Sequence, residues 1–133
     1  MRVRAILAEI FPYFAESLIP QEENIIPPWL TSLTVKMEKS ENLSAGLPRM
    51  LELSNKTREH LSRSFKKYYG VTLTDYINDL RINYASNLLI NTNIPIIDIC
   101  FSCGFQSMSY FYRVFKKKNG TTPNIFREKQ KIV

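Results

Sequence analysis

Cationic side chains recur in the same pattern in two segments that lie fifty residues apart. HLSRSFKKYYGVT occupies residues 60–72, and YFYRVFKKKNGTT occupies residues 110–122. In both segments an arginine is followed three and four residues later by a pair of lysines: Arg63, Lys66, Lys67 and Arg113, Lys116, Lys117. An internal repeat indicates one supersecondary unit used twice. Clustered Lys and Arg suit a polyanion such as nucleic acid or an anionic membrane surface.

Each repeat predicts an amphipathic helix with one face in the core. Leu61 and Phe65 lie four residues apart, as do Phe111 and Phe115, so each pair faces inward. The opposite faces then present Glu59, Ser62, Arg63, Met108, Ser109, Tyr112 and Arg113. Arg suits guanine through two parallel hydrogen bonds, Ser suits several bases, and Tyr or Met suits the methyl group of thymine.

A second set of residues is expected to contact phosphates instead of bases. Its lysines lie further along each helix, where neutralising the DNA backbone is the more natural role. Its hydroxyl residues are the predicted helix N-caps. The set comprises Thr57, Lys66, Lys67, Ser107, Lys116, Lys117 and Lys118.

The composition indicates a globular chain whose basic character is concentrated in the repeats. The 133 residues suffice for one ordinary domain, or for two very small ones that share a helix. Hydrophobic residues make up 44% of the chain, so a packed core is expected. The net charge is +6, and residues 55–133 carry 13 of the 18 Lys and Arg but only 5 of the 12 Asp and Glu. The charge therefore accompanies the repeats, as in a nucleic-acid-binding surface.

The elements that must position these residues are all predicted to be helices. No segment alternates polar and apolar residues as a half-buried strand does, so the fold class is all-α. An N-terminal helix over residues 2–19, bent or divided at Pro12, is followed by a linker that is rich in proline. The remaining helices are predicted over residues 29–40, 43–53, 57–69, 74–90, 95–102, 107–118 and from 123 onward. The helix over 74–90 should bury Tyr76, Ile77, Leu80, Tyr84, Leu88 and Leu89.

Each repeat therefore consists of a short helix, a tight turn and a longer basic helix, which is the helix-turn-helix arrangement. Gly104 in the second turn and Asn55 in the first are suited to a positive φ. The helix over 74–90 would span about 25 Å at about 1.5 Å per residue. Such a connector can hold two recognition helices in major-groove segments about 34 Å apart on one DNA face.

Two long motifs resemble a known family. SNKTREHLSRSFKKYYGVTLTDYINDLRINYASNLL and IPIIDICFSCGFQSMSYFYRVFKKKNGTTPNIFRE resemble the DNA-binding domain of the AraC/XylS family of bacterial transcription regulators over residues 29–128. The resemblance implies a seven-helix domain in which a long linker helix joins two helix-turn-helix subdomains. It places the base-contacting positions on Glu59, Ser62, Arg63, Met108, Ser109, Tyr112 and Arg113. Met50 and Cys100 depart from the family pattern, which has small residues there, and Asn55 replaces the more usual glycine.

The resemblance also implies how the chain is organised and what it binds. Residues 28–133 would form the DNA-binding domain, and residues 1–27 a helical extension between domains or for dimerisation. The expected partners are promoter or operator DNA, RNA polymerase and a second copy, held through that extension or through a sensor domain. The chain would be the C-terminal part of an effector-responsive regulator, or else a short stand-alone regulator. Because the sequence has no apolar run of transmembrane length and no signal peptide is expected, we expect it in the cytoplasm.

Two other readings of the sequence remain open. Cys100-x-x-Cys103 is the spacing of a redox pair or of half a zinc site, but no second cysteine pair exists and His60 is the only histidine. We therefore expect packing cysteines, no metal, no cofactor and no enzymatic activity. The basic helices would also fit a non-enzymatic interaction module that meets an acidic partner protein. A preference for one DNA site over random duplex distinguishes a DNA-binding protein from such an interaction module.

Overall fold

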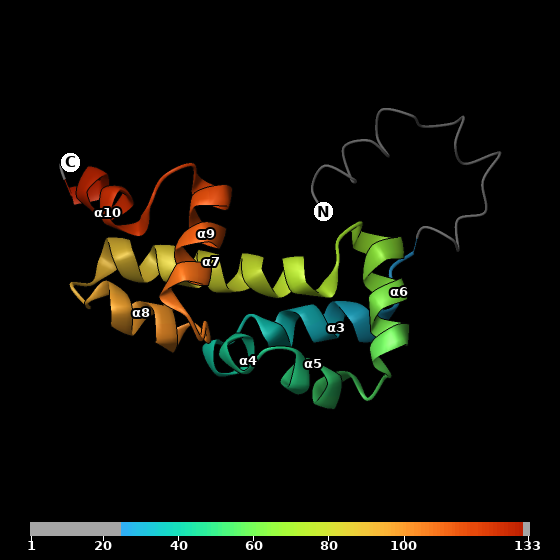
Figure 1. Ribbon diagram of the computed structural model, residues 1–133. Helices are drawn as coiled ribbons and strands as arrows, with labels where there is room; N and C mark the ends of the chain where they lie inside the picture. Colours follow the sequence, from blue (N-terminus) through green and yellow to red (C-terminus); the bar gives the residue numbers. More distant parts are fainter. Residues whose placement is uncertain (1–24, 132–133) are drawn as a thin grey trace.

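A computed structural model describes residues 25–131 of the chain, and every regular element in this range is a helix (Figure 1). The all-α prediction is therefore confirmed, whereas the helix predicted over residues 2–19 lies outside the described residues. The helices are α3 (Pro28–Met37), α4 (Ser40–Ala45), α5 (Leu47–Ser54), α6 (Arg58–Tyr69), α7 (Leu73–Asn91), α8 (Ile96–Ser102), α9 (Met108–Asn119) and α10 (Pro123–Lys131).

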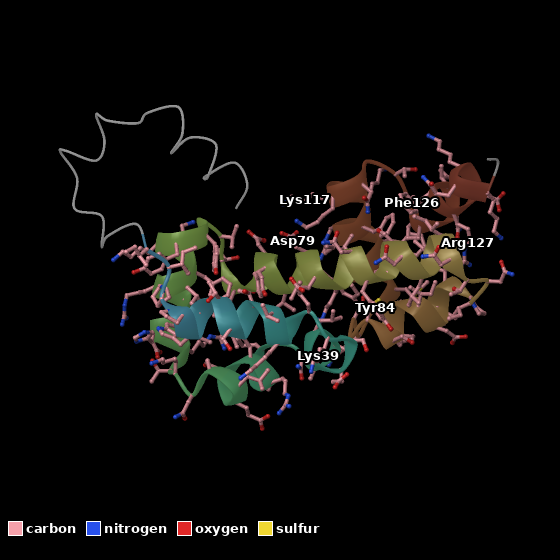
Figure 2. The ribbon with its side chains drawn as sticks, turned by 180° about the vertical axis from the view of Figure 1, so that it is seen from behind. Lys39, Asp79, Tyr84, Lys117, Phe126 and Arg127 are labelled. Carbon is pink, nitrogen blue, oxygen red and sulfur yellow. The ribbon has the colours of Figure 1, made fainter. Side chains whose placement is uncertain are left out.

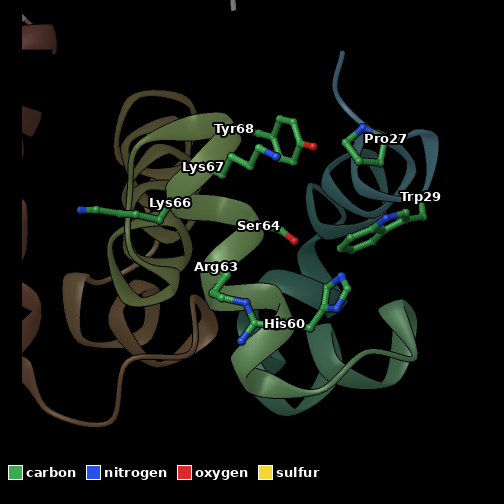
Figure 3. A pocket seen from close by; sticks show the side chains of 8 residues that line it. All are labelled: Pro27, Trp29, His60, Arg63, Ser64, Lys66, Lys67 and Tyr68. Carbon is green, nitrogen blue, oxygen red and sulfur yellow. The ribbon is translucent and has the colours of Figure 1, made fainter. Parts of the chain in front are cut away.

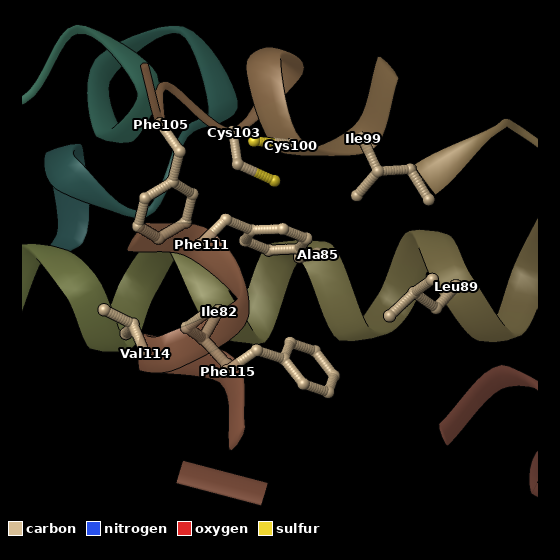
Figure 4. Packing of buried hydrophobic residues seen from close by; sticks show 10 residues of the cluster. All are labelled: Ile82, Ala85, Leu89, Ile99, Cys100, Cys103, Phe105, Phe111, Val114 and Phe115. Carbon is tan, nitrogen blue, oxygen red and sulfur yellow. The ribbon is translucent and has the colours of Figure 1, made fainter. Parts of the chain in front are cut away.

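Two hydrophobic cores lie at opposite ends of the long helix α7. The first core joins α3, α5, α6 and the start of α7, and consists of Leu30, Leu33, Met37, Met50, Leu61, Phe65, Leu73 and Ile77. The second joins the rest of α7 to α8 and α9, and consists of Ile82, Ala85, Leu89, Ile99, Cys100, Cys103, Phe105, Phe111, Val114 and Phe115 (Figure 4). Each core, with the helices that pack around it, forms one helix-turn-helix unit. Helix α7 therefore belongs to both units.

Helix α7 buries a different set of residues from the single stripe predicted for it. Leu73, Ile77, Asn78, Ile82, Ala85 and Leu89 are buried, whereas Tyr76, Leu80, Tyr84 and Leu88 are partly buried against the two cores. The reason is that α7 has neighbours on several sides, so apolar residues are needed around most of its circumference.

The segment predicted as one helix over residues 43–53 is two helices, α4 and α5, divided at Gly46. Gly46 has φ 79° and ψ −147°, a backbone conformation that glycine adopts without steric cost and that cannot continue an α-helix. Pro48 lies in the first turn of α5, where its missing N–H leaves no helix hydrogen bond unmade. The described part of the chain therefore has eight helices.

The sequence repeat is also a structural repeat of three helices, α5–α6–α7 and α8–α9–α10. The side chains of Thr57 and Ser107 cap α6 and α9 by accepting hydrogen bonds from the backbone N–H of His60 (3.1 Å) and Tyr110 (3.0 Å). Gly70 and Gly120 end the same helices in the left-handed conformation.

The third helix of each repeat packs an aromatic ring on the basic helix before it. The ring centroids of Phe65 and Tyr76 are 4.7 Å apart, and those of Phe115 and Phe126 are 5.4 Å apart. Figure 2 shows Phe126 and Arg127 of α10 beside the C-terminal half of α7. The two basic helices are therefore held by equivalent contacts.

Candidate nucleic-acid interface

The two basic helices, α6 and α9, lie crosswise to α7 at separate points along the molecule. Figure 1 shows α6 beside the N-terminal end of α7 and α9 crossing α7 nearer its middle. Leu61 and Phe65 on α6, and Phe111 and Phe115 on α9, are fully buried, as their spacing predicts. Each helix therefore has one side fixed in a core and the other turned away from it.

The structure places the predicted base-contacting residues on these outward sides. Glu59, Ser62 and Arg63 are exposed on α6, and Ser109 and Arg113 are exposed on α9. Met108 and Tyr112 are partly buried, because each also packs against the second core. Because the side chains of Met108 and Tyr112 are packed, they change rotamer less freely than the exposed side chains beside them.

The lysines predicted to contact phosphates follow in the last turns of α6 and α9. Lys66, Lys67, Lys116 and Lys117 are exposed. Lys118 differs from them, because its ammonium group forms an ion pair with Asp79 on α7. All five lysines are therefore exposed, but the ammonium group of Lys118 is held by an ion pair with the linker helix.

Arg113 is held by two residues that the sequence patterns did not single out. Its guanidinium carbon lies 5.2 Å from the ring centroid of Tyr110, a cation–π distance. The hydroxyl of Tyr110 in turn accepts a hydrogen bond of 2.8 Å from the side-chain amide of Asn78, which is buried on α7. No signal in the sequence marks Asn78, because α7 carries several other polar residues; its burial in the structure shows that its amide requires a partner.

A groove lies between the first basic helix and the start of α3 (Figure 3). It encloses about 590 Å³ and is lined by Pro27, Trp29, His60, Arg63, Ser64, Lys66, Lys67 and Tyr68. The ring centroids of Trp29 and His60 are 5.4 Å apart, and the Lys56 ammonium lies 4.8 Å from the Trp29 ring centroid. Trp29, the first residue of the helix predicted over residues 29–40, thus joins a cationic surface.

The two cysteines have the environment of core residues. Both are fully buried in the second core, and burial raises the pKa of the Cys100 thiol and raises that of Cys103 to about 12. Because the thiolate is the nucleophile and metal ligand, neutral buried thiols favour packing over redox or zinc chemistry. Over residues 25–131, no three His, Cys, Asp or Glu side chains are grouped closely enough to hold a metal ion.

Within the same residues, none of the helices has the length and hydrophobicity that crossing a bilayer requires.

Comparison with known proteins finds transcription regulators. A family model described as a helix-turn-helix domain matches residues 51–129. The chain is 35% identical over 104 residues to the bifunctional transcriptional activator/DNA repair enzyme AdaA of Bacillus subtilis (strain 168), covering 78% of this chain and 49% of that protein. It is 33% identical over 106 residues to the probable transcription factor PqrA of Proteus vulgaris, covering 80% of this chain and 85% of that protein.

Solved structures show the same likeness. A crystal structure of a transcriptional regulator from Chromobacterium violaceum, described among AraC-type DNA-binding domain-containing proteins, matches with a TM-score of 0.68 and 30% identity. The match covers 77% of this chain and 92% of that one. By contrast, the chain spans about half the length of AdaA.

Proposed function

The chain belongs to the AraC-type helix-turn-helix family of transcription regulators, and from that premise we propose that it binds double-stranded DNA by inserting α6 and α9 into adjacent major-groove segments. The observation that carries the proposal is the matched pair of exposed basic faces, presented by one scaffold helix. Each face combines an arginine opposite the core with lysines in the last helical turn. That combination supplies base contacts and phosphate contacts from the same helix.

The two helices would contact unlike half-sites. Arg63 and Arg113 are common to both and suit guanine. The neighbouring positions differ, since Glu59 and Ser62 on α6 correspond to Ser109 and Tyr112 on α9. Glu accepts a hydrogen bond from cytosine, whereas Tyr and the nearby Met108 present apolar surface to thymine. The half-sites would therefore share a guanine and differ around it.

The groove between α3 and α6 would extend the contact to the DNA backbone beside the first half-site. Lys67 and Arg63 lie along it, with Trp29 on the opposite wall (Figure 3). An indole N–H and neighbouring cations are suitable donors to a phosphate oxygen. Thr57 and Ser107, at the N-termini of the two basic helices, would add further phosphate contacts.

The wider role belongs to the same proposal. Residues 28–133 would act as a DNA-binding domain without catalysis, in the cytoplasm, and would recruit RNA polymerase to a promoter. Residues 1–27, or a sensor domain, would bring two copies together. The ancestry shared with transcriptional activators supports recruitment, and the basic surface supports the DNA contact.

Selection of binding sites from a pool of random duplexes tests the proposal. Two short motifs about one helical turn apart should emerge, and the selected site should bind about 10³-fold or more tightly than random duplex. Equal binding to selected and random duplexes would instead favour a basic module that meets an acidic partner protein.

Arginine and lysine variants then separate base contacts from phosphate contacts. Arg63→Ala and Arg113→Ala should each cost about 1–3 kcal/mol on the selected site and relax one base position in a repeated selection. Lys117→Ala is the matched control. It should weaken all duplexes alike and reduce the salt dependence of log K by about one unit. An Arg63→Ala variant that weakens specific and random DNA equally would remove that residue from the base-contacting set.

A further inference from the structure

The contact between the two helix-turn-helix units contains an arginine that lies on neither basic helix. Arg81 is on α7, and its Nε and Nη2 atoms donate hydrogen bonds to the backbone carbonyls of Leu43 (2.9 Å) and Ser44 (3.0 Å). Those carbonyls belong to the last turn of α4, where a helix leaves its acceptors unpaired. Arg81 thus caps a helix of the first unit with a charged donor, which is a stronger bond than a neutral one.

The same guanidinium contacts the second unit. Its central carbon lies 5.7 Å from the ring centroid of Phe105, a buried residue in the turn between α8 and α9. In the close view of the second core, Phe105 lies on the side nearest the α4 segment (Figure 4). Arg81 therefore touches α4 of one unit and the helix-turn-helix turn of the other.

Two glycines show how closely the parts fit at this junction. A Cβ at Gly104, in the turn before α9, would overlap the carbonyl oxygen of Ser44 at the end of α4. A Cβ at Gly46, just after α4, would overlap Nη2 of Arg81. The junction of α4, Arg81 and the turn at Gly104–Phe105 is therefore packed with no space for a methyl group on either side.

From this geometry we infer that Arg81 is a spacing-determining residue, which fixes the distance and rotation between α6 and α9 and thereby the number of base pairs between the two half-sites. The inference rests on the proposed insertion of both helices into DNA. Helix α7 alone would allow the units to twist and bend about their connection, whereas the contact between α4 and the turn adds a second point of attachment. One inserted base pair moves a half-site by about 3.4 Å and about 35° around the duplex axis. A rigidly joined pair of helices cannot follow that displacement.

A matched control is available on the opposite side of the second unit. Arg127 on α10 donates two hydrogen bonds of 3.1 Å to the carbonyls of Leu89 and Thr92 at the end of α7. This is the same kind of helix cap, with the same number of hydrogen bonds, but it lies wholly within the second unit. Arg127→Met should therefore perturb stability as Arg81→Met does, without loosening the junction.

The experiment compares the full chain and its variants on the selected DNA site and on versions with one base pair inserted or deleted between the half-sites. The spacing penalty is the dissociation constant for an altered site divided by the dissociation constant for the selected site. For the unaltered chain we expect a penalty of at least about tenfold, since one half-site loses base contacts. Arg81→Met should bind the selected site more weakly but reduce the penalty to about threefold or less, whereas Arg127→Met should keep the original penalty.

Several outcomes would overturn the inference. An unchanged penalty in Arg81→Met removes the role of Arg81, and an unaltered chain that tolerates the inserted base pair removes the rigid spacing itself. If Arg81→Met does not fold by circular dichroism, Arg81→Lys is the test, because one ammonium group cannot reproduce the two directed guanidinium bonds. Failure of the proposed function is distinguishable, since the unaltered chain would then select no site at all.

Discussion

At the scale of single residues, aromatic rings position three cations on or beside the proposed DNA surface. Tyr110 underlies Arg113, Trp29 underlies Lys56, and Tyr68 lies 5.1 Å from the Lys67 ammonium. A long cationic side chain loses rotamer freedom when it binds, so a side chain that is already ordered loses less. Arg113 is further constrained, because its ring partner Tyr110 is itself hydrogen-bonded to Asn78 on α7.

The bond between Asn78 and Tyr110 gives a prediction about stability. Tyr110→Phe keeps the ring under Arg113 but leaves the buried amide of Asn78 without its acceptor, so we expect the free energy of unfolding to fall by about 1–3 kcal/mol. Urea denaturation measures the loss. The double variant Asn78→Leu with Tyr110→Phe removes the orphaned amide and should recover part of that stability. Simple addition of two single losses would show that the hydrogen bond is not the cause.

The outward-facing residues of α6 and α9 could be predicted from the sequence, whereas the residues that hold them in position could not. The spacing of Leu61 and Phe65 determines which way a helix faces, so Arg63 could be placed without a structure. The hydrogen bond from Asn78 to Tyr110 joins residues 32 positions apart. No local pattern encodes such a contact, because it depends on how α9 lies across α7.

At the scale of elements, the turn of the first unit depends on a non-glycine residue in a left-handed conformation. Asn55 has φ 58° and ends α5, and among residues 25–131 it is the one non-glycine with positive φ. We expect Asn55→Ala to destabilise the fold by about 1 kcal/mol, the steric cost of a Cβ without a compensating polar group. Asn55→Gly should retain or increase the stability, because glycine takes this conformation freely. Thermal unfolding measured on both variants checks this, and similar losses for Ala and Gly would contradict it.

Helix ends could be predicted closely where the signal is local. Thr57, Ser107, Gly70 and Gly120 occupy the cap positions that their residue types favour. The division at Gly46 was missed, because a glycine within an apolar segment has several explanations. Its actual context, close to the guanidinium of Arg81, arises only when α4 packs beside α7.

At the scale of the whole molecule, a carboxylate on the linker helix pairs with one cation of the proposed DNA surface. Asp79 on α7 pairs with Lys118 and so reduces the positive charge at the end of α9. We expect Asp79→Asn to free Lys118 for a phosphate, to strengthen binding to every duplex and to steepen the salt dependence of log K by about one unit. Stability should change by about 1 kcal/mol or less, because the pair is partly exposed to solvent.

Binding isotherms at several salt concentrations measure this effect. Asp98→Asn on α8 makes the same change in net charge and serves as the control. An equal gain from both variants would attribute the effect to total charge, and an unchanged slope in Asp79→Asn would show that Lys118 does not reach a phosphate. Either result would remove Lys118 from the phosphate-contacting set.

The two-unit arrangement itself was predictable, because a repeated motif requires a repeated fold. How the units join was not. Arg81 is an ordinary residue in the sequence, and Gly104 is marked there only as a turn residue. Their contact with the end of α4 involves backbone carbonyls, which have no sequence signature. The sequence predicts a connector helix that holds the two recognition helices, and the structure adds this second attachment.

Helix α7 shares its length between two cores, with Leu73 and Ile77 in the first and Ile82, Ala85 and Leu89 in the second. Loss of either core removes the support for part of the same helix, so local opening at one end of α7 raises the cost of keeping the other end ordered. The units are consequently coupled in folding, and the described chain should melt in a single cooperative transition instead of two. We therefore expect that neither unit remains folded when it is cut free of the other.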